Sequence, residues 1–437
     1  MRHKLQKIFL IAMALPATVF GQDTIPISRN ELLQKAADAN LQLKIANADI
    51  NAARADYRQS NAIFLPSISA SATAMATTNP LMAFGSKLNQ EVLTASDFNP
   101  ALLNDPDRTQ NFATRVEVQQ PLINMDGFYG RQAAKAKMQA YGFQAERTKA
   151  YLELELAKAY MQLQLAYKAV AVIEKAAATT NANLKLVENY YKQGILQKTD
   201  LLSMQLRMNE VNNQKQYALS NVQNASDYLA FLLNQDNAGK VYKPVDKLEA
   251  ENGGTTVVVT LPDGRADLQA IDQTVAAYRK MYQSANMKFL PRLNAFGTYE
   301  LYDRNLFGTS ASGYTIGAQL SWALFDGFGS VGKMQRAKAD YQKSEIERDQ
   351  YKAQSQLELN KTNRQLTDAA NNVNLARLAL DQSKEAYRIR SNRFGQGLEK
   401  TTDLLQAETQ QSQKELELSQ AIFEYNSTAA YLHFLTQ

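Results

Sequence analysis

The sequence predicts a mixed α and β protein with an internal two-fold repeat, in which each half combines two short strands with a long helical hairpin. Three observations predict this class: a turn motif that occurs twice, apolar residues at intervals of seven before each turn, and four segments of alternating polarity. Together they favour one elongated, duplicated chain over two or three separate globular domains.

The turn motif ends one helical stretch near residue 194 and another near residue 397. Gly194, Thr199 and Asp200-Leu201-Leu202 recur 203 positions later as Gly397, Thr402 and Asp403-Leu404-Leu405. In each copy the glycine suits the positive φ that ends a helix, and Thr-Asp is typical of the cap of the next helix. The motif therefore predicts two helical hairpins, with tips at about 192–200 and 394–403.

Apolar residues recur every seven positions in the helix before each tip. The two stripes are Leu359, Leu366, Val373, Leu380, Tyr387 and Phe394 in the second half, and Leu156, Leu163, Val170, Ala177, Leu184 and Tyr191 in the first. A seven-residue apolar repeat of this length indicates coiled-coil packing between helices. A purely structural coiled coil is the simpler interpretation, but it does not explain why strands bracket each hairpin.

Alternating polarity predicts strands at about 67–77, 111–120, 292–302 and 313–324. Each has a polar and an apolar face, and the polar faces carry Arg115, Glu117, Gln119 and Gln319. Strands of about ten residues can cross a bilayer when tilted. A small soluble β-sandwich with one polar face is the alternative.

If the four strands lie in lipid, several copies of the chain must complete the sheet. A sheet in lipid has to close so that no edge amide is unpaired, and two copies would supply eight strands whereas three would supply twelve. Polar inner faces favour the larger, water-filled barrel. Aromatic girdles at the membrane interfaces are then expected at Phe112, Tyr299, Tyr314 and Trp322.

Residues 1–21 have the features of a secretory signal: three basic residues, an apolar run, and small residues before a cleavage point. Removal of these three charges lowers the formal net charge from +5 to +2, which gives no indication of nucleic-acid binding. The chain has no cysteine, which excludes disulfides, thiol catalysis and Cys-based metal sites. Beyond the signal, no apolar stretch reaches the ~20 residues of a membrane-spanning helix.

Start and stop signals give the remaining boundaries: a first repeat at 22–234, a linker at 235–265 and a second repeat at 266–437. A capping box at Ser28 and Glu31 begins a helix that weakens near Asn40 and continues to about Phe64. Residues 79–111, rich in Pro, Asn and Asp, predict a long loop.

An enzymatic function has the least support. His3 lies in the signal and His433 stands alone, so no histidine cluster or His-based triad can form. No Gly-rich phosphate loop follows a strand. We therefore assign no catalytic residue, no metal ligand and no cofactor.

The chain resembles the outer membrane efflux proteins, the TolC-like family. The resemblance covers nearly all of the mature chain and is most specific at Phe394–Ala407 with Lys414-Glu415-Leu416 beyond it. It implies a homotrimer with one twelve-stranded barrel in the bacterial outer membrane and a helical tunnel in the periplasm. Such proteins are passive exit ducts of tripartite efflux pumps or type I secretion systems, joined to a periplasmic adaptor and an inner-membrane pump.

The resemblance also implies roles for tip residues. Asp200 and Asp403 match acidic rings at the pore constriction, where Gln406 replaces a second acid. The turn residues Gly194, Ile195, Gly397 and Leu398 are implied to dock the adaptor.

Two departures from the family pattern lie beside these residues. Glu399 replaces an arginine and Phe394 a tyrosine, so the lock that closes the tips of the type member is not inherited. Helix capping is the alternative role of Asp200 and Asp403, with Gln406 completing a capping box at the second tip. The competing function is a periplasmic coiled-coil scaffold or adaptor without a pore.

Overall fold

The structure is a computed structural model that describes residues 24–236, 239–250 and 258–437 of the chain. The predicted signal segment, 1–21, lies outside the described residues. The chain divides into two compact units. Unit 1 takes residues 1–41, 151–258 and 360–435, and unit 2 takes residues 42–150, 259–359 and 436–437.

Unit 2 contains one antiparallel sheet in the strand order β2-β3-β5-β6. Its strands are β2 (Ser67–Thr77), β3 (Thr109–Ile123), β5 (Arg292–Asp303) and β6 (Ala311–Ser321). The four predicted strands are thus present. Trp322, expected inside the fourth strand, follows its end. The first residue of β5 pairs with Ser321, and the proline before β5 has no N–H to extend the ladder.

The strand register sorts polar and apolar side chains onto opposite faces. Residues directly opposite each other in a sheet point to the same side. One row across all four strands is Ser69, Glu117, Thr298 and Thr315. The next row, on the other face, is Ala70, Val116, Tyr299 and Tyr314. The predicted alternation therefore becomes one polar and one apolar face of the whole sheet.

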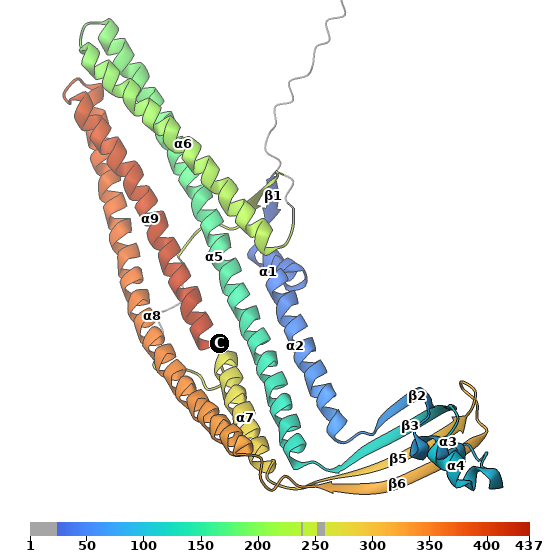
Figure 1. The fold of residues 1–437 in the computed structure, drawn as a ribbon. Helices are drawn as coiled ribbons and strands as arrows, with labels where there is room; N and C mark the ends of the chain where they lie inside the picture. The colour runs from blue at the N-terminus through green and yellow to red at the C-terminus, as the bar shows by residue number, and fades with distance from the viewer. Residues whose placement is uncertain (1–23, 237–238, 251–257) are drawn as a thin grey trace, which may run out of the picture. The chain divides into compact units, whose positions relative to one another are not determined.

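Four helices of unit 2 lie next to the sheet in sequence: α2 (Leu41–Gln59), α7 (Ala266–Met287) and the sheet-proximal parts of α5 (Met125–Lys192) and α8 (Gly329–Gly395). Figure 1 shows them in the order α2, α5, α7, α8. Side-chain contacts join each neighbouring pair: Arg131 lies over the Tyr57 ring, Ser284 donates to the Asp126 carbonyl, and the Tyr282 and Tyr341 rings stack.

The prediction of a long loop over 79–111 missed two helices. The segment contains α3 (Pro80–Asn89) and α4 (Pro100–Asn104). Both helices begin with Asn-Pro, in which the asparagine side chain caps the first turn and the proline takes a position that needs no N–H. We interpreted Asn-Pro as a turn signal, whereas the same pair can also begin a helix.

Unit 1 holds the two hairpins and a short parallel pair that the sequence analysis missed. Its further elements are β1 (Thr24–Ile27), α1 (Arg29–Ala39), α6 (Lys198–Leu232), β4 (Val241–Pro244) and α9 (Thr401–Thr436). β1 pairs with β4. The predicted capping box of α1 is present, and the helix breaks at Asn40, whose side chain donates to the Leu232 carbonyl at 2.8 Å. A four-residue strand is too short to show a period.

The seven-residue stripe of the second half forms a core, whereas the stripe of the first half is displaced toward its end. Leu359, Leu380 and Phe394 are all buried. In α5, however, Tyr191 is 39% exposed and Val187 is fully buried. The buried position in α5 is therefore Val187, four residues before the predicted Tyr191, whereas α8 keeps the seven-residue spacing to Phe394.

Candidate functional site

The two hairpin tips have the same backbone turn. Gly194 and Gly397 have φ values of 73° and 72°, as predicted for residues that end a helix. The next residues, Ile195 and Leu398, donate backbone hydrogen bonds to the carbonyls of Tyr190 and Arg393, both at 2.9 Å. Sequence repetition at the tips is therefore repetition of structure.

Each tip presents one aliphatic side chain to solvent. Ile195 is 61% exposed and Leu398 is 64% exposed. They hold equivalent places in the two turns. The two turns therefore expose matching apolar side chains.

Neither acidic tip residue is itself an N-cap, but Asp200 does have a capping role, because it completes a capping box with Gln197. The N-cap of α6 is Gln197, and Asp200, three residues later, accepts a hydrogen bond from its backbone N–H at 3.1 Å. Asp403 instead lies 3.8 Å from the Arg390 guanidinium, and it does not form the expected capping box with Gln406. Both helices begin before their Thr-Asp pair, so the aspartates lie inside the first turn.

The second tip carries its own ion-pair cluster. Glu399 contacts Arg393 at 2.8 Å and Arg390 at 3.3 Å. Arg390 also reaches Asp403, so one guanidinium lies between two carboxylates. The two basic residues lie on the last turns of α8, opposite the start of α9. The sequence analysis noted Glu399 only as a departure and missed its partners.

A buried cluster joins the two hairpins just behind the tips. It consists of Val187, Met204, Phe394 and Leu404. The Tyr190 ring lies 6.2 Å from the Phe394 ring, and its hydroxyl donates to the Gly395 carbonyl at 3.1 Å. Phe394 is 2% exposed. Phe394 itself has no hydroxyl, so the hydrogen bond between the hairpins comes from Tyr190.

Gln406 lies farther along α9, in a hollow of about 570 Å³ between α6 and α9. Its lining includes Arg207, which is buried and pairs with Glu210 at 3.4 Å. Nearby, the Glu408 carboxylate is buried and accepts hydrogen bonds from Thr180 and Asn183. The structure places Gln406 one turn from Asp403, but no contact joins their side chains.

The predicted lumen residues share the polar face of the sheet. Arg115 forms an ion pair with Glu300, its direct cross-strand neighbour, rather than with Glu117. Glu117 accepts a hydrogen bond from Gln119 at 2.6 Å. Gln319 lies on the same face of β6, opposite Asn294. The face is mainly polar, although Phe296 lies on it opposite Gln119, and the charges of Arg115 and Glu300 balance each other.

The predicted girdle aromatics lie on or beside the apolar face. Tyr299 and Tyr314 are paired across β5 and β6 and are 50% and 76% exposed. Phe112 lies four residues along β3 from the partner of Tyr299. Trp322 is 59% exposed at the opposite end of the strands, and its indole N–H donates to the Phe289 carbonyl at 3.0 Å. The set thus lies toward both ends of the sheet.

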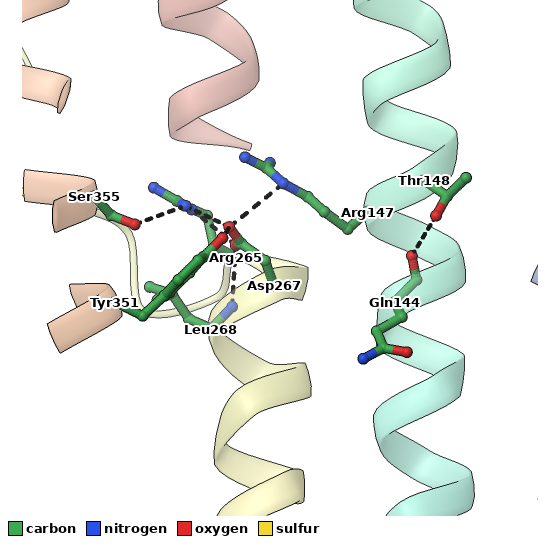
Figure 2. A network of polar contacts seen from close by, with 8 residues as sticks. All are labelled: Gln144, Arg147, Thr148, Arg265, Asp267, Leu268, Tyr351 and Ser355. Atoms are coloured by element: carbon green, nitrogen blue, oxygen red, sulfur yellow. Dashed lines mark hydrogen bonds and ion pairs between the residues drawn. The ribbon is translucent and has the colours of Figure 1, made fainter. Parts of the chain in front are cut away.

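Figure 2 shows a polar network that holds α5, α7 and α8 together within unit 2. Its centre is Asp267, which is bound by Arg265, by Tyr351 at 2.7 Å and by Arg147 at 3.5 Å. Burial would raise the pKa of the Asp267 carboxyl, but the hydrogen bonds from Arg265 and Tyr351 and the charge of Arg147 hold it below its ordinary value of 3.8. Ser355 contacts Arg265 at 3.4 Å.

Within the described ranges, no helix combines the length and apolarity needed to cross a bilayer. The same residues contain no group of three or more His, Cys, Asp or Glu side chains that could hold a metal ion.

Comparison with known proteins finds one family and several solved structures. The family model described as outer membrane efflux protein matches residues 32–235 and 259–436. Comparison with curated protein sequences finds no match.

The solved structures share the fold at low sequence identity. VceC from Vibrio cholerae is similar with a TM-score of 0.78 and 18% identity, over 93% of this chain and 96% of that one. The CmeC outer membrane channel of Campylobacter jejuni has a TM-score of 0.79 and 15% identity, over 93% and 85%. The open-state MtrE outer membrane channel of Neisseria gonorrhoeae has a TM-score of 0.73 and 15% identity, over 93% and 88%.

Proposed function

Because the chain belongs to the outer membrane efflux protein family, we propose that three copies assemble into one channel that acts as a passive exit duct. Membership confirms the predicted fold class and the predicted location, with strands in the bacterial outer membrane and helices in the periplasm. The proposal adds the trimer, a periplasmic adaptor and an inner-membrane pump. Drug, metal and protein cargo remain equally compatible with such a duct.

The observation that carries the trimer is the sheet with two open edges. β2 and β6 each pair on one side only, and each is eleven residues long. Adjacent strands are antiparallel, so β6 of one copy can continue the alternation with β2 of the next. Lipid cannot satisfy the free amides, and closure into a ring does.

The two faces of the sheet support a water-filled barrel. Arg115, Glu117, Gln119 and Gln319 would line its lumen. Large apolar side chains on the other face, such as Ile316 at 79% exposure, would contact lipid. Twelve strands leave an aqueous lumen, whereas eight are filled by their own side chains. A scaffold without a pore gives these exposed apolar residues no partner.

The absence of cysteine makes the closure testable by engineered disulfides. Ala72→Cys on β2 is combined in turn with Tyr314→Cys, Ile316→Cys or Ala318→Cys on β6, all on the apolar face. Within one chain β3 and β5 separate these positions by about 14 Å, too far for a disulfide. We expect one combination to give a covalent trimer under oxidation. The control moves one cysteine to an interior strand: Thr114→Cys on β3 with Ala318→Cys on β6 should give no covalent trimer. A chain that stays monomeric at every register would refute closure.

At the tips we propose a constriction formed by Asp200, Asp403 and Gln406, beside a docking surface formed by Gly194, Ile195, Gly397 and Leu398. Close-set carboxylates favour cations. Asp403→Ala and Asp403→Asn should therefore weaken block by divalent cations to the same extent in planar bilayers, because both remove the charge. If block changes only in the alanine variant, Asp403 supports the helix and does not line the pore.

A further inference from the structure

A second charged site lies in unit 2, far along the chain from the tips. A hollow of about 480 Å³ is lined by residues of all four helices, α2, α5, α7 and α8. Most of the lining is small, for example Gly130, Ala134 and Ala277. Its four charged residues are Asp56, Lys137, Lys288 and Lys333. The helices thus approach closely and leave three ammonium groups around an open space.

The order of the four helices indicates on which face of their row the hollow lies. Neighbours are joined in the order α2, α5, α7, α8, which is the order seen in Figure 1. One space can border all four helices of a row only if the row curves around it. The hollow therefore lies on the concave face of the row. When three copies close into a ring, the concave face is the inner one. The hollow would then be part of the channel wall, directly below the barrel.

The charge of this wall differs from that of the neighbouring surfaces. All three lysines are exposed. Among the described residues none of them forms an ion pair, although the Lys137 ammonium lies 5.9 Å from the Tyr141 ring. With Asp56 the lining carries a net charge of two positive units per chain. The lumen face of the sheet, in contrast, pairs Arg115 with Glu300.

We infer that these lysines form a cationic ring inside the tunnel that favours anionic solutes over cationic ones, an inference that rests on the proposed channel. Three copies would contribute nine lysines and three aspartates at one level. Fixed charges of one sign along a narrow path concentrate counter-ions and select among permeating solutes. The tunnel would then carry acidic residues at its periplasmic tips and basic residues near the membrane.

The test is the ratio of chloride to potassium permeability of single channels, measured from reversal potentials in a KCl gradient. Lys137→Glu changes six unit charges in a trimer. At roughly 10 Å, about one Debye length at 0.1 M salt, we expect the ratio to fall about threefold or more. At 1 M salt, where the Debye length is about 3 Å, the difference should largely disappear.

Lys135→Glu is the matched control. Lys135 is on the same helix and is equally exposed, but two residues correspond to about 200° around the axis, so it points away from the hollow. It should leave the ratio unchanged. Lys288→Gln removes a charge without reversing it, so it should shift the ratio in the same direction as Lys137→Glu by a smaller factor. This second variant keeps the inference testable if Lys137→Glu fails to fold.

The outcomes separate this inference from the channel proposal. If the wild-type protein opens no channels, the proposed function fails and the inference with it. If channels open but Lys137→Glu and Lys288→Gln leave the ratio unchanged, only the cationic ring is refuted. The same holds if Lys135→Glu is the variant that changes it, because the convex face would then line the tunnel.

Discussion

Replacing Asp267 by asparagine should loosen unit 2 at the start of α7. Arg265 has a side chain only 2% exposed, and Asp267 is 10% exposed, so the substitution removes a carboxylate that a buried guanidinium contacts. Breaking a buried pair in this way costs about 3–5 kcal/mol. Asparagine keeps the size and one acceptor oxygen, and we therefore expect a loss of about 2–4 kcal/mol.

Hydrogen–deuterium exchange measures this loss where it arises. If local opening governs exchange, about 2–4 kcal/mol corresponds to roughly 30- to 700-fold faster exchange of the hydrogen-bonded amides that begin at Gln269 in α7. Tyr351→Phe removes one hydrogen bond of the same network, at 2.7 Å. It should speed exchange by only about 2- to 12-fold.

The pH dependence of the effect has a defined sign. The pKa of Asp267 is lowered in the folded chain, so its stabilisation is complete above the ordinary value of 3.8 and is lost as the pH falls through the lowered value. The difference between wild type and Asp267→Asn should therefore shrink below pH 3.8. Asp349→Asn is the control, because Asp349 is 67% exposed and, among the described residues, forms an ion pair only with Arg348. Equal exchange in wild type and Asp267→Asn would refute the reasoning.

Two further predictions concern unit 1. Glu408→Ala removes the buried acceptor of the Thr180 hydroxyl and the Asn183 amide. It should lower the free energy of unfolding by about 1–3 kcal/mol, and Glu408→Gln should lower it by less. Denaturant unfolding followed by circular dichroism compares the two variants. Gly397→Ala should cost about 1–2 kcal/mol through its φ of 72° alone, because no atom lies within 4 Å of an added methyl, and Gly395→Ala, equally uncrowded but helical, should cost nothing.

Regular patterns were predictable from the sequence because they report local geometry. Alternation gave the two faces of the sheet, and the rows through Glu117 and Val116 confirm it across four strands. Pairing between distant segments leaves no such trace. β1 and β4 are four residues each and more than 200 positions apart, so neither segment's sequence predicts that it pairs with the other. The helices at 80–89 and 100–104 were missed because Asn-Pro serves both turns and helix starts.

The tips show why a count of carboxylates is a poor guide to charge at a constriction. The sequence analysis set Asp200 beside Asp403 as equivalent acidic residues, because they are equivalent in the repeat. In the structure the Asp200 carboxylate accepts a hydrogen bond from the Gln197 backbone N–H. Asp403 instead forms an ion pair with Arg390, which also pairs with Glu399.

With Arg393 included, the second tip has two cations and two anions within one ion-pair cluster. The net charge of this four-residue cluster is therefore zero, although Glu399 stands where the family pattern has an arginine. An opposite charge at 3.8 Å weakens the field that Asp403 presents to a passing cation. The cation preference of the proposed constriction should then depend on Arg390 as much as on Asp403, and release of Arg390 from Asp403 would strengthen it.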